Sequence, residues 1–69
     1  MIEVRTSYIH IGHGLPFDKA AAAAVGRPPD FSGFHKDGNR DLGWVCKSEL
    51  EAERIKRVLA KIGLSAEIR

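Results

Sequence analysis

The chain has 69 residues, of which 43% are hydrophobic and 29% charged, and eleven basic and nine acidic side chains give a net charge of +2. This length predicts one domain over residues 1–69 and excludes a two-domain enzyme, an eight-fold α/β barrel and a long solenoid. The charge is too small to commit the protein to nucleic acid. The lone Cys46, the absence of a signal-peptide pattern and the absence of a long apolar run favour a cytoplasmic protein with no membrane segment.

The first predicted element is a long strand over residues 2–11, a segment rich in β-branched side chains. Its alternation is imperfect, because Ile2 and Val4 share one parity whereas Ile9 and Ile11 share the other. We therefore expect either a bulge near Thr6 and Ser7 or a strand that buries different faces at its two ends.

A short helix is predicted next, from Asp18 to about Val25, because five consecutive alanines have high helix propensity. Asp18 is expected either as the N-cap or as an acid in the first turn, where the helix dipole favours it. Gly26 is a plausible C-cap, and the prolines that follow prevent continuation. Alanines on the inner side would let this helix approach a sheet closely.

Residues 31–47 are expected to form a hairpin, since Asp37-Gly38 is a strong turn signal with apolar and aromatic residues on both sides. The alternative that the sequence leaves open is a long mobile loop over residues 27–41.

The last third predicts a helix and a closing strand. Ser48 and Glu51 form a capping box, in which the Glu51 side chain is expected to return to the Ser48 N–H. Gly63 is the expected C-cap, and residues 66–68 alternate as a strand. The apolar residues on one helical face are Ile55, Val58, Leu59 and Ile62.

The element order β-α-β-β-α-β predicts a ferredoxin-like α+β sandwich. Its antiparallel four-stranded sheet would have the strand order 4-1-3-2 with both helices on one face. The other face would be open, and we expect function on that face or on the loops at its rim.

Residues 40–47, RDLGWVCK, resemble the octapeptide of the RNA-recognition motif. The residues that match are Arg40, Gly43, Trp44 and Val45. The residues that depart from it are Asp41, Leu42 and Lys47. In that family aromatic side chains stack on bases, so the resemblance implies a single-stranded nucleic-acid site. Trp44 would be the stacking residue of this strand, and His10 takes the corresponding aromatic place in the first strand.

The parity of this strand decides whether such a site exists. If Gly43 and Val45 face the helices, an aromatic and apolar patch lies on the open face. That patch would consist of Tyr8, His10, Leu42, Trp44 and Cys46. If the parity is reversed, Leu42, Trp44 and Cys46 belong to the core, and the sequence leaves both possibilities open.

The candidate residues for nucleic-acid or partner binding are Tyr8, His10, Arg40, Trp44 and Lys47. The aromatic rings would stack, and the two cations would meet phosphates. Arg54, Arg57 and Lys61 form a second basic surface on the polar side of the last helix, which is either simply solvated or contacts a phosphate or an acidic protein surface. Glu53 also has the spacing for an ion pair with Arg57.

Two further resemblances concern the two ends of the chain. The segment from Trp44 to Ala66 is similar to the strand–helix–strand half of SPOR domains, which bind peptidoglycan, although the first half of the chain lacks their Leu-rich helix. Residues 10–13 spell HIGH, the signature of class I aminoacyl-tRNA synthetases. Those enzymes need a long Rossmann sheet and a second, lysine-rich signature, so we interpret this match as coincidence.

Neither a cofactor nor a metal is expected, because His10, His13, His35 and Cys46 lack the usual ligand spacing. No set of nucleophile, base and orienting group is present, so the protein is not expected to be an enzyme. The sequence predicts a small binding module that takes single-stranded nucleic acid on its open sheet face. The alternative is a protein-interaction module, either a homodimer or a small inhibitor of a larger complex. Its contact would be the same patch, or the second basic surface against an acidic protein surface. Salt dependence of binding would separate the two.

Overall fold

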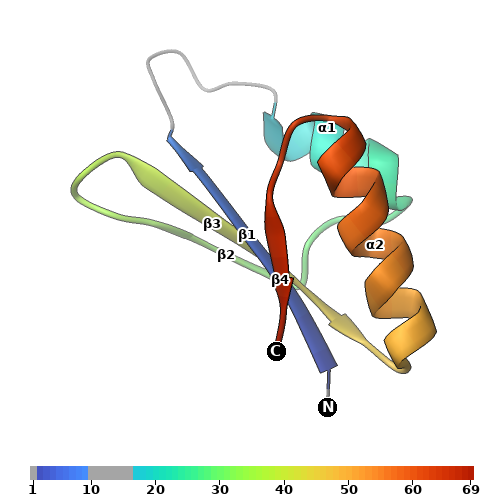
Figure 1. Ribbon diagram of the computed structural model, residues 1–69. Helices are drawn as coiled ribbons and strands as arrows, with labels where there is room; N and C mark the ends of the chain where they lie inside the picture. The colour runs from blue at the N-terminus through green and yellow to red at the C-terminus, as the bar shows by residue number, and fades with distance from the viewer. Residues whose placement is uncertain (1, 10–16) are drawn as a thin grey trace.

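The computed structural model describes residues 2–9 and 17–69. The elements are β1 (Ile2–Ile9), α1 (Phe17–Val25), β2 (Phe31–Phe34), β3 (Asn39–Cys46), α2 (Glu49–Lys61) and β4 (Ala66–Ile68). They form a small α+β protein whose strands make one antiparallel sheet in the order β2-β3-β1-β4. Both helices lie on the same side of this sheet (Figure 1). His10 and His13, together with the predicted end of the first strand, lie outside the described residues.

Strand β1 is regular. It pairs with β3 residue by residue over its whole length, so the predicted bulge is wrong. Val4 and Thr6 are buried on the helix side, whereas Ile9 is 65% exposed. The strand therefore does not bury its opposite face at Ile9, and the second expectation fails there too. The alternation of apolar residues was misleading because Thr6, a polar residue, is buried, whereas Ile9, an apolar residue, is exposed.

The predicted hairpin is confirmed, and the alternative of a long loop is wrong for residues 31–41. β2 pairs with the first half of β3. In the turn, the His35 N–H donates to the carbonyl of Asn39 at 2.8 Å, and Gly38 takes a positive φ of 92°. Asp37 adds a side-chain bond to the backbone N–H of Asn39 at 3.0 Å, which is the local turn chemistry typical of aspartate.

Helix α2 begins as predicted but with one difference. The Ser48 hydroxyl accepts a bond from the Glu51 N–H at 3.2 Å, which satisfies one of the free donors of the first turn. The Glu51 carboxylate, however, pairs with Arg27 at 3.1 Å instead of returning to the Ser48 N–H. Arg27 lies in the link between α1 and β2, so this ion pair ties that link to the start of α2.

Helix α1 ends directly before Gly26, as predicted, whereas the C-cap of α2 is Ile62, one residue before the predicted Gly63. Gly63 has a φ of 86°, a conformation that residues with a Cβ rarely adopt, and the N–H of Leu64 then bonds to the carbonyl of Leu59 at 2.9 Å. Asp18 lies in the first turn of α1, so it takes the second of its two predicted roles.

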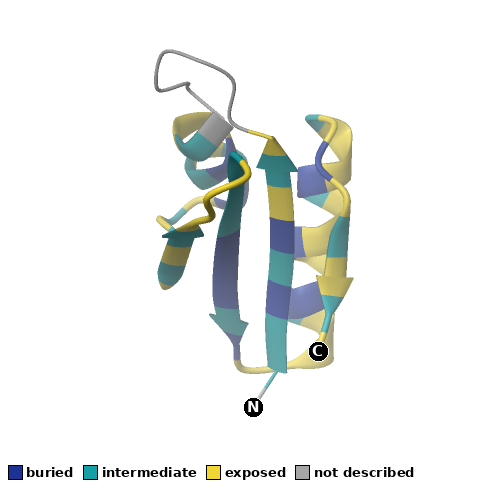
Figure 2. Ribbon diagram, turned by 90° about the vertical axis from the view of Figure 1, so that its left-hand side faces the viewer, coloured by how far each residue is buried: buried dark blue, intermediate teal, exposed yellow. Residues whose placement is uncertain are grey.

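The core lies between the sheet and the helices. Figure 2 shows the buried residues along the two central strands and on the side of α2 that faces them. Its largest fully buried side chains are Trp44, Leu42, Ile55, Leu59 and Val4. Thr6 is the buried polar residue of this part of the chain, and its hydroxyl donates to the Ser65 carbonyl at 2.6 Å.

The two ends of the described chain are paired. The backbone groups of Glu3 and Arg69 exchange two hydrogen bonds, of 3.0 and 2.8 Å, beyond the end of β4. The N and C marks accordingly lie close together in Figure 1. Neither of the two helices is long and apolar enough to cross a membrane.

Candidate functional site

The structure settles the parity of β3. Trp44 is fully buried on the helix side, with Leu42 and Cys46, because Trp44 pairs with the buried Val4 across the sheet. The outward placement of these three residues is therefore wrong. The indole N–H of Trp44 donates to the carbonyl of Arg27 at 3.1 Å, so its one polar atom is satisfied inside the fold. The ring is not placed to stack on a base at the surface.

Tyr8 and Arg40 come together, but on the helix side of the sheet. The Tyr8 hydroxyl donates to the Asp18 carboxylate, and Arg40 donates to the same carboxylate at 2.7 Å and stacks over the ring of Phe34 at 5.1 Å. The cluster joins β1, β3 and the first turn of α1. The Arg40 guanidinium is paired with the Asp18 carboxylate. This structural role weakens the case for Arg40 as a phosphate ligand.

Lys47 lies apart from this cluster. It is exposed in the link between β3 and α2, at the opposite end of β3 from Arg40. Seven residues of extended chain separate the two cations by about 23 Å. His10 lies outside the described residues, and of the other four candidate residues the structure brings Tyr8 and Arg40 together.

Burial, followed by the hydrogen bond and negative charge of Asp18, raises the pKa of Tyr8 from 10.0 to about 12. The folded pKa exceeds the unfolded one, so the stability that Tyr8 adds is complete below pH 10 and is lost as the pH rises through 12. The protein has one tyrosine, so phenolate absorbance reports this group alone. We expect Asp18→Asn to lower the pKa, though not fully to 10.0, because burial remains. An ordinary titration in the unchanged protein would contradict the buried geometry.

The open face of the sheet carries paired charges. Arg5 pairs with Glu3 at 2.9 Å, and its guanidinium lies 4.9 Å from the centre of the Phe31 ring. On the same face, His35 pairs with Asp41 at 2.5 Å, and this carboxylate raises the pKa of His35. The charges on this face largely cancel, unlike those of a basic nucleic-acid platform.

One exposed surface along α2 is different, and we name it the outer face of α2. It consists of the exposed residues Glu49, Leu50, Glu53, Arg57, Ala60 and Lys61. Leu50 is 81% exposed, more than Ile9 or Phe34, which are the other large exposed hydrophobic residues of the described chain. An isolated exposed leucine is common, but this one lies among charged groups that form no ion pair within the described part of the chain.

The three residues of the predicted second basic surface, Arg54, Arg57 and Lys61, differ in their contacts. Arg54 donates to the carbonyl of Val25 at 3.1 Å and so helps to terminate α1. Arg57 and Lys61 form no hydrogen bond or ion pair with the other described residues. The predicted pair between Glu53 and Arg57 is also not formed. The four charged groups of the outer face are therefore free to meet a partner.

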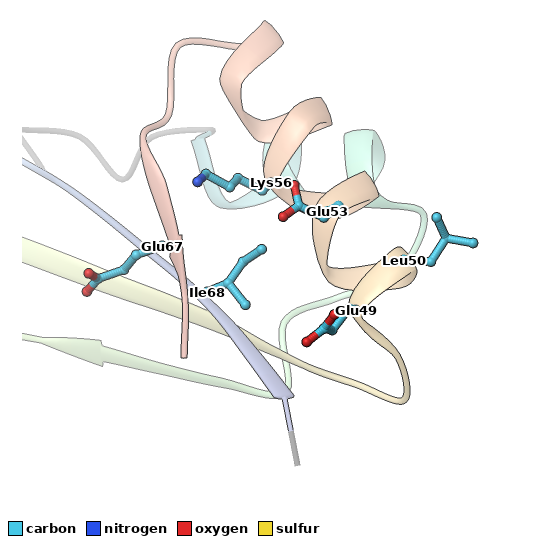
Figure 3. Close-up of a pocket in the computed structure, with 6 residues that line it drawn as sticks. All are labelled: Glu49, Leu50, Glu53, Lys56, Glu67 and Ile68. Carbon is cyan, nitrogen blue, oxygen red and sulfur yellow. The ribbon is translucent and has the colours of Figure 1, made fainter.

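Two surface pockets flank Leu50. The first, of about 660 Å³, lies between α2 and β4 (Figure 3) and is lined by Glu49, Leu50, Glu53, Lys56, Glu67 and Ile68. The second, of about 530 Å³, is lined by Arg27, Ser48, Leu50, Glu51, Arg54 and Arg57. The first has three carboxylates and one ammonium, whereas the second has three guanidiniums and one carboxylate. The surface around the start of α2 is thus divided by charge, with Leu50 at the boundary.

The sequence contained a signal for this surface. Leu50 precedes Ile55 by five positions, which places it about 140° around the helix from the buried face. At that angle an apolar residue cannot belong to the core, and it is not typical of a helix side that is fully solvated. The role of Phe31 on the open face had no comparable signal, because it depends on the pairing of Phe31 with Gly43.

Within residues 2–9 and 17–69, no group of three or more potential metal ligands gathers. Comparison with protein-family models, curated proteins and solved structures gives no match for this chain.

Proposed function

We propose that the chain is a small, non-catalytic binding module that contacts another protein through the outer face of α2. The observation that carries the proposal is the exposure of Leu50 between two pockets of opposite charge. Protein interfaces combine an apolar centre with a polar rim, and removal of an exposed leucine from water at such a centre is favourable. Charges of both signs around that centre suit a protein surface better than a phosphate backbone.

Single-stranded nucleic acid is the second candidate, and three exposed cations that form no ion pair with the other described residues favour it: Lys47, Arg57 and Lys61. Its weakness is the loss of the stacking platform, since Trp44 is buried. A labelled single-stranded RNA titrated at two salt concentrations tests it. Affinity that falls steeply with salt and is lost in Arg57→Glu/Lys61→Glu would favour nucleic acid over protein.

We also propose a fold type and a cellular location for the chain. Counted from β4, the strand order is 4-1-3-2, which supports the ferredoxin-like plan for a single domain. The single cysteine is buried and has no second thiol to pair with, which supports a cytoplasmic location.

A photo-crosslinking amino acid at position 50, in the cells that produce the protein, tests the main proposal. The matched control is the same amino acid at Ser7, an exposed position of β1. We expect protein adducts at position 50 that disappear when Arg57→Glu is added, and none at position 7. Adducts only at position 7, or adducts that nuclease removes, would contradict the proposal.

A further inference from the structure

We infer that the partner of the outer face of α2 is the same face of a second copy, with the two helices antiparallel about a two-fold axis. The inference rests on the proposed function and names its partner. It starts from the fact that six residues of one helix, Glu49, Leu50, Glu53, Arg57, Ala60 and Lys61, are exposed together.

The spacing of these residues is self-complementary. In an antiparallel pair whose axis passes level with the middle of α2, each position meets the position equally far beyond the middle on the other copy. Glu53 then meets Arg57, and Glu49 meets Lys61. Leu50 meets Ala60, a small side chain that leaves room for it. Each contact occurs twice, so the interface contains four opposite-charge contacts and two apolar ones.

The six positions also share one surface. Positions 50, 53, 57 and 60 follow the three- and four-residue spacing of a single helical face, as packing between two helices requires. The helix dipole by itself favours acids at the start and bases at the end of α2. It does not explain why Leu50 lies between them on the side that faces solvent.

The strength of this contact is limited by its length. A helix of 13 residues is about 20 Å long, so the buried surface falls below the roughly 800 Å² per partner of a standard stable interface. The whole described chain has an accessible surface of 4569 Å². We therefore expect a weak, reversible dimer whose population rises with protein concentration and falls with salt.

A charge exchange between positions 53 and 57 tests the inference by sedimentation. Glu53→Arg places four positive groups at the centre of the interface, and Arg57→Glu places four negative ones. We expect each variant to associate at least about 10-fold more weakly than the unchanged protein, because like charges then meet. An equimolar mixture of the two variants restores opposite charges at every contact, so we expect it to form a heterodimer. The double variant Glu53→Arg/Arg57→Glu should dimerise with itself again.

Lys36→Glu is the matched control, because it makes the same charge change at an exposed position of the β2–β3 turn, away from α2, and it should leave association unchanged. Circular dichroism confirms that each variant is folded. Monomers at every concentration, or association that Arg57→Glu leaves intact, would overturn the inference. If the chain is monomeric but position 50 still crosslinks to a different protein, the proposed function stands and the self-pairing fails. If position 50 crosslinks to no protein, both fail.

Discussion

Replacing Trp44 by alanine is expected to destabilise the protein by about 3–5 kcal/mol, the usual cost of emptying a fully buried aromatic site. Trp44 is 0% exposed and has the largest of the fully buried side chains. A domain of this size has a total stability of only about 3–10 kcal/mol. We therefore expect Trp44→Ala to be largely unfolded, with its urea midpoint lowered or lost when followed by circular dichroism.

Trp44→Phe is the control for this change, because it keeps most of the apolar volume and loses the indole N–H that bonds to Arg27. It should remain folded with a smaller loss, of about 1–3 kcal/mol. In the unchanged protein, emission from the single tryptophan should be blue-shifted and move to the red on unfolding. An alanine variant as stable as the original would place Trp44 outside the core and restore the open-face parity.

The second large effect concerns Gly43 in the middle of β3. The ring of Phe31 lies across it so closely that a Cβ on Gly43 would come within 2.1 Å of the ring. Gly43→Ala must push the ring away and break its stacking with Arg5, so we expect a loss of about 1–3 kcal/mol.

A double-mutant cycle identifies the cause. In a Phe31→Ala background the obstacle is gone, and alanine is usually better than glycine within a strand by about 0.5–1 kcal/mol. Gly43→Ala should then be neutral or stabilising, so the two changes are strongly coupled. Equal losses in both backgrounds would mean that the ring does not cover Gly43, and that the alanine methyl group conflicts with something else.

The sequence predicted the elements well because their boundaries are local chemistry. The Ser48 cap, the Asp37-Gly38 turn and the glycine after each helix act through neighbouring residues, so they can be recognised without the rest of the fold. The Asp18 position, inside the first turn of α1, follows from the same rules.

The binding site could not be predicted in the same way, because the face of a strand depends on its neighbours. In β3 both parities are plausible, since Val45 offers an apolar side chain opposite to Leu42 and Trp44. Which face of β3 is buried follows from its register with β1, where Val4 and Thr6 are buried. A threonine whose hydroxyl finds a carbonyl 59 positions away cannot be recognised from its own segment.

Arg27 gives a second example of long-range chemistry. Its guanidinium bonds to Asp30, to the Val45 carbonyl and to Glu51, and its own carbonyl accepts the Trp44 indole. Apart from the pair with Asp30, three positions away, nothing near Arg27 in the sequence predicts these contacts. They explain why only half of the predicted capping box forms, because Glu51 is already held by Arg27.

The paired chain ends have a practical consequence for engineering. Because the backbones of Glu3 and Arg69 are hydrogen-bonded to each other, a linker of a few residues is enough to join them into a circular chain. Closure would restrict the unfolded ensemble and leave the native contacts in place. The β2–β3 turn, with Gly38 at its tip, then offers a place to open a permuted chain. New ends at that turn would move the point of attachment to a surface or a second domain from the Glu3–Arg69 corner to the other end of β1.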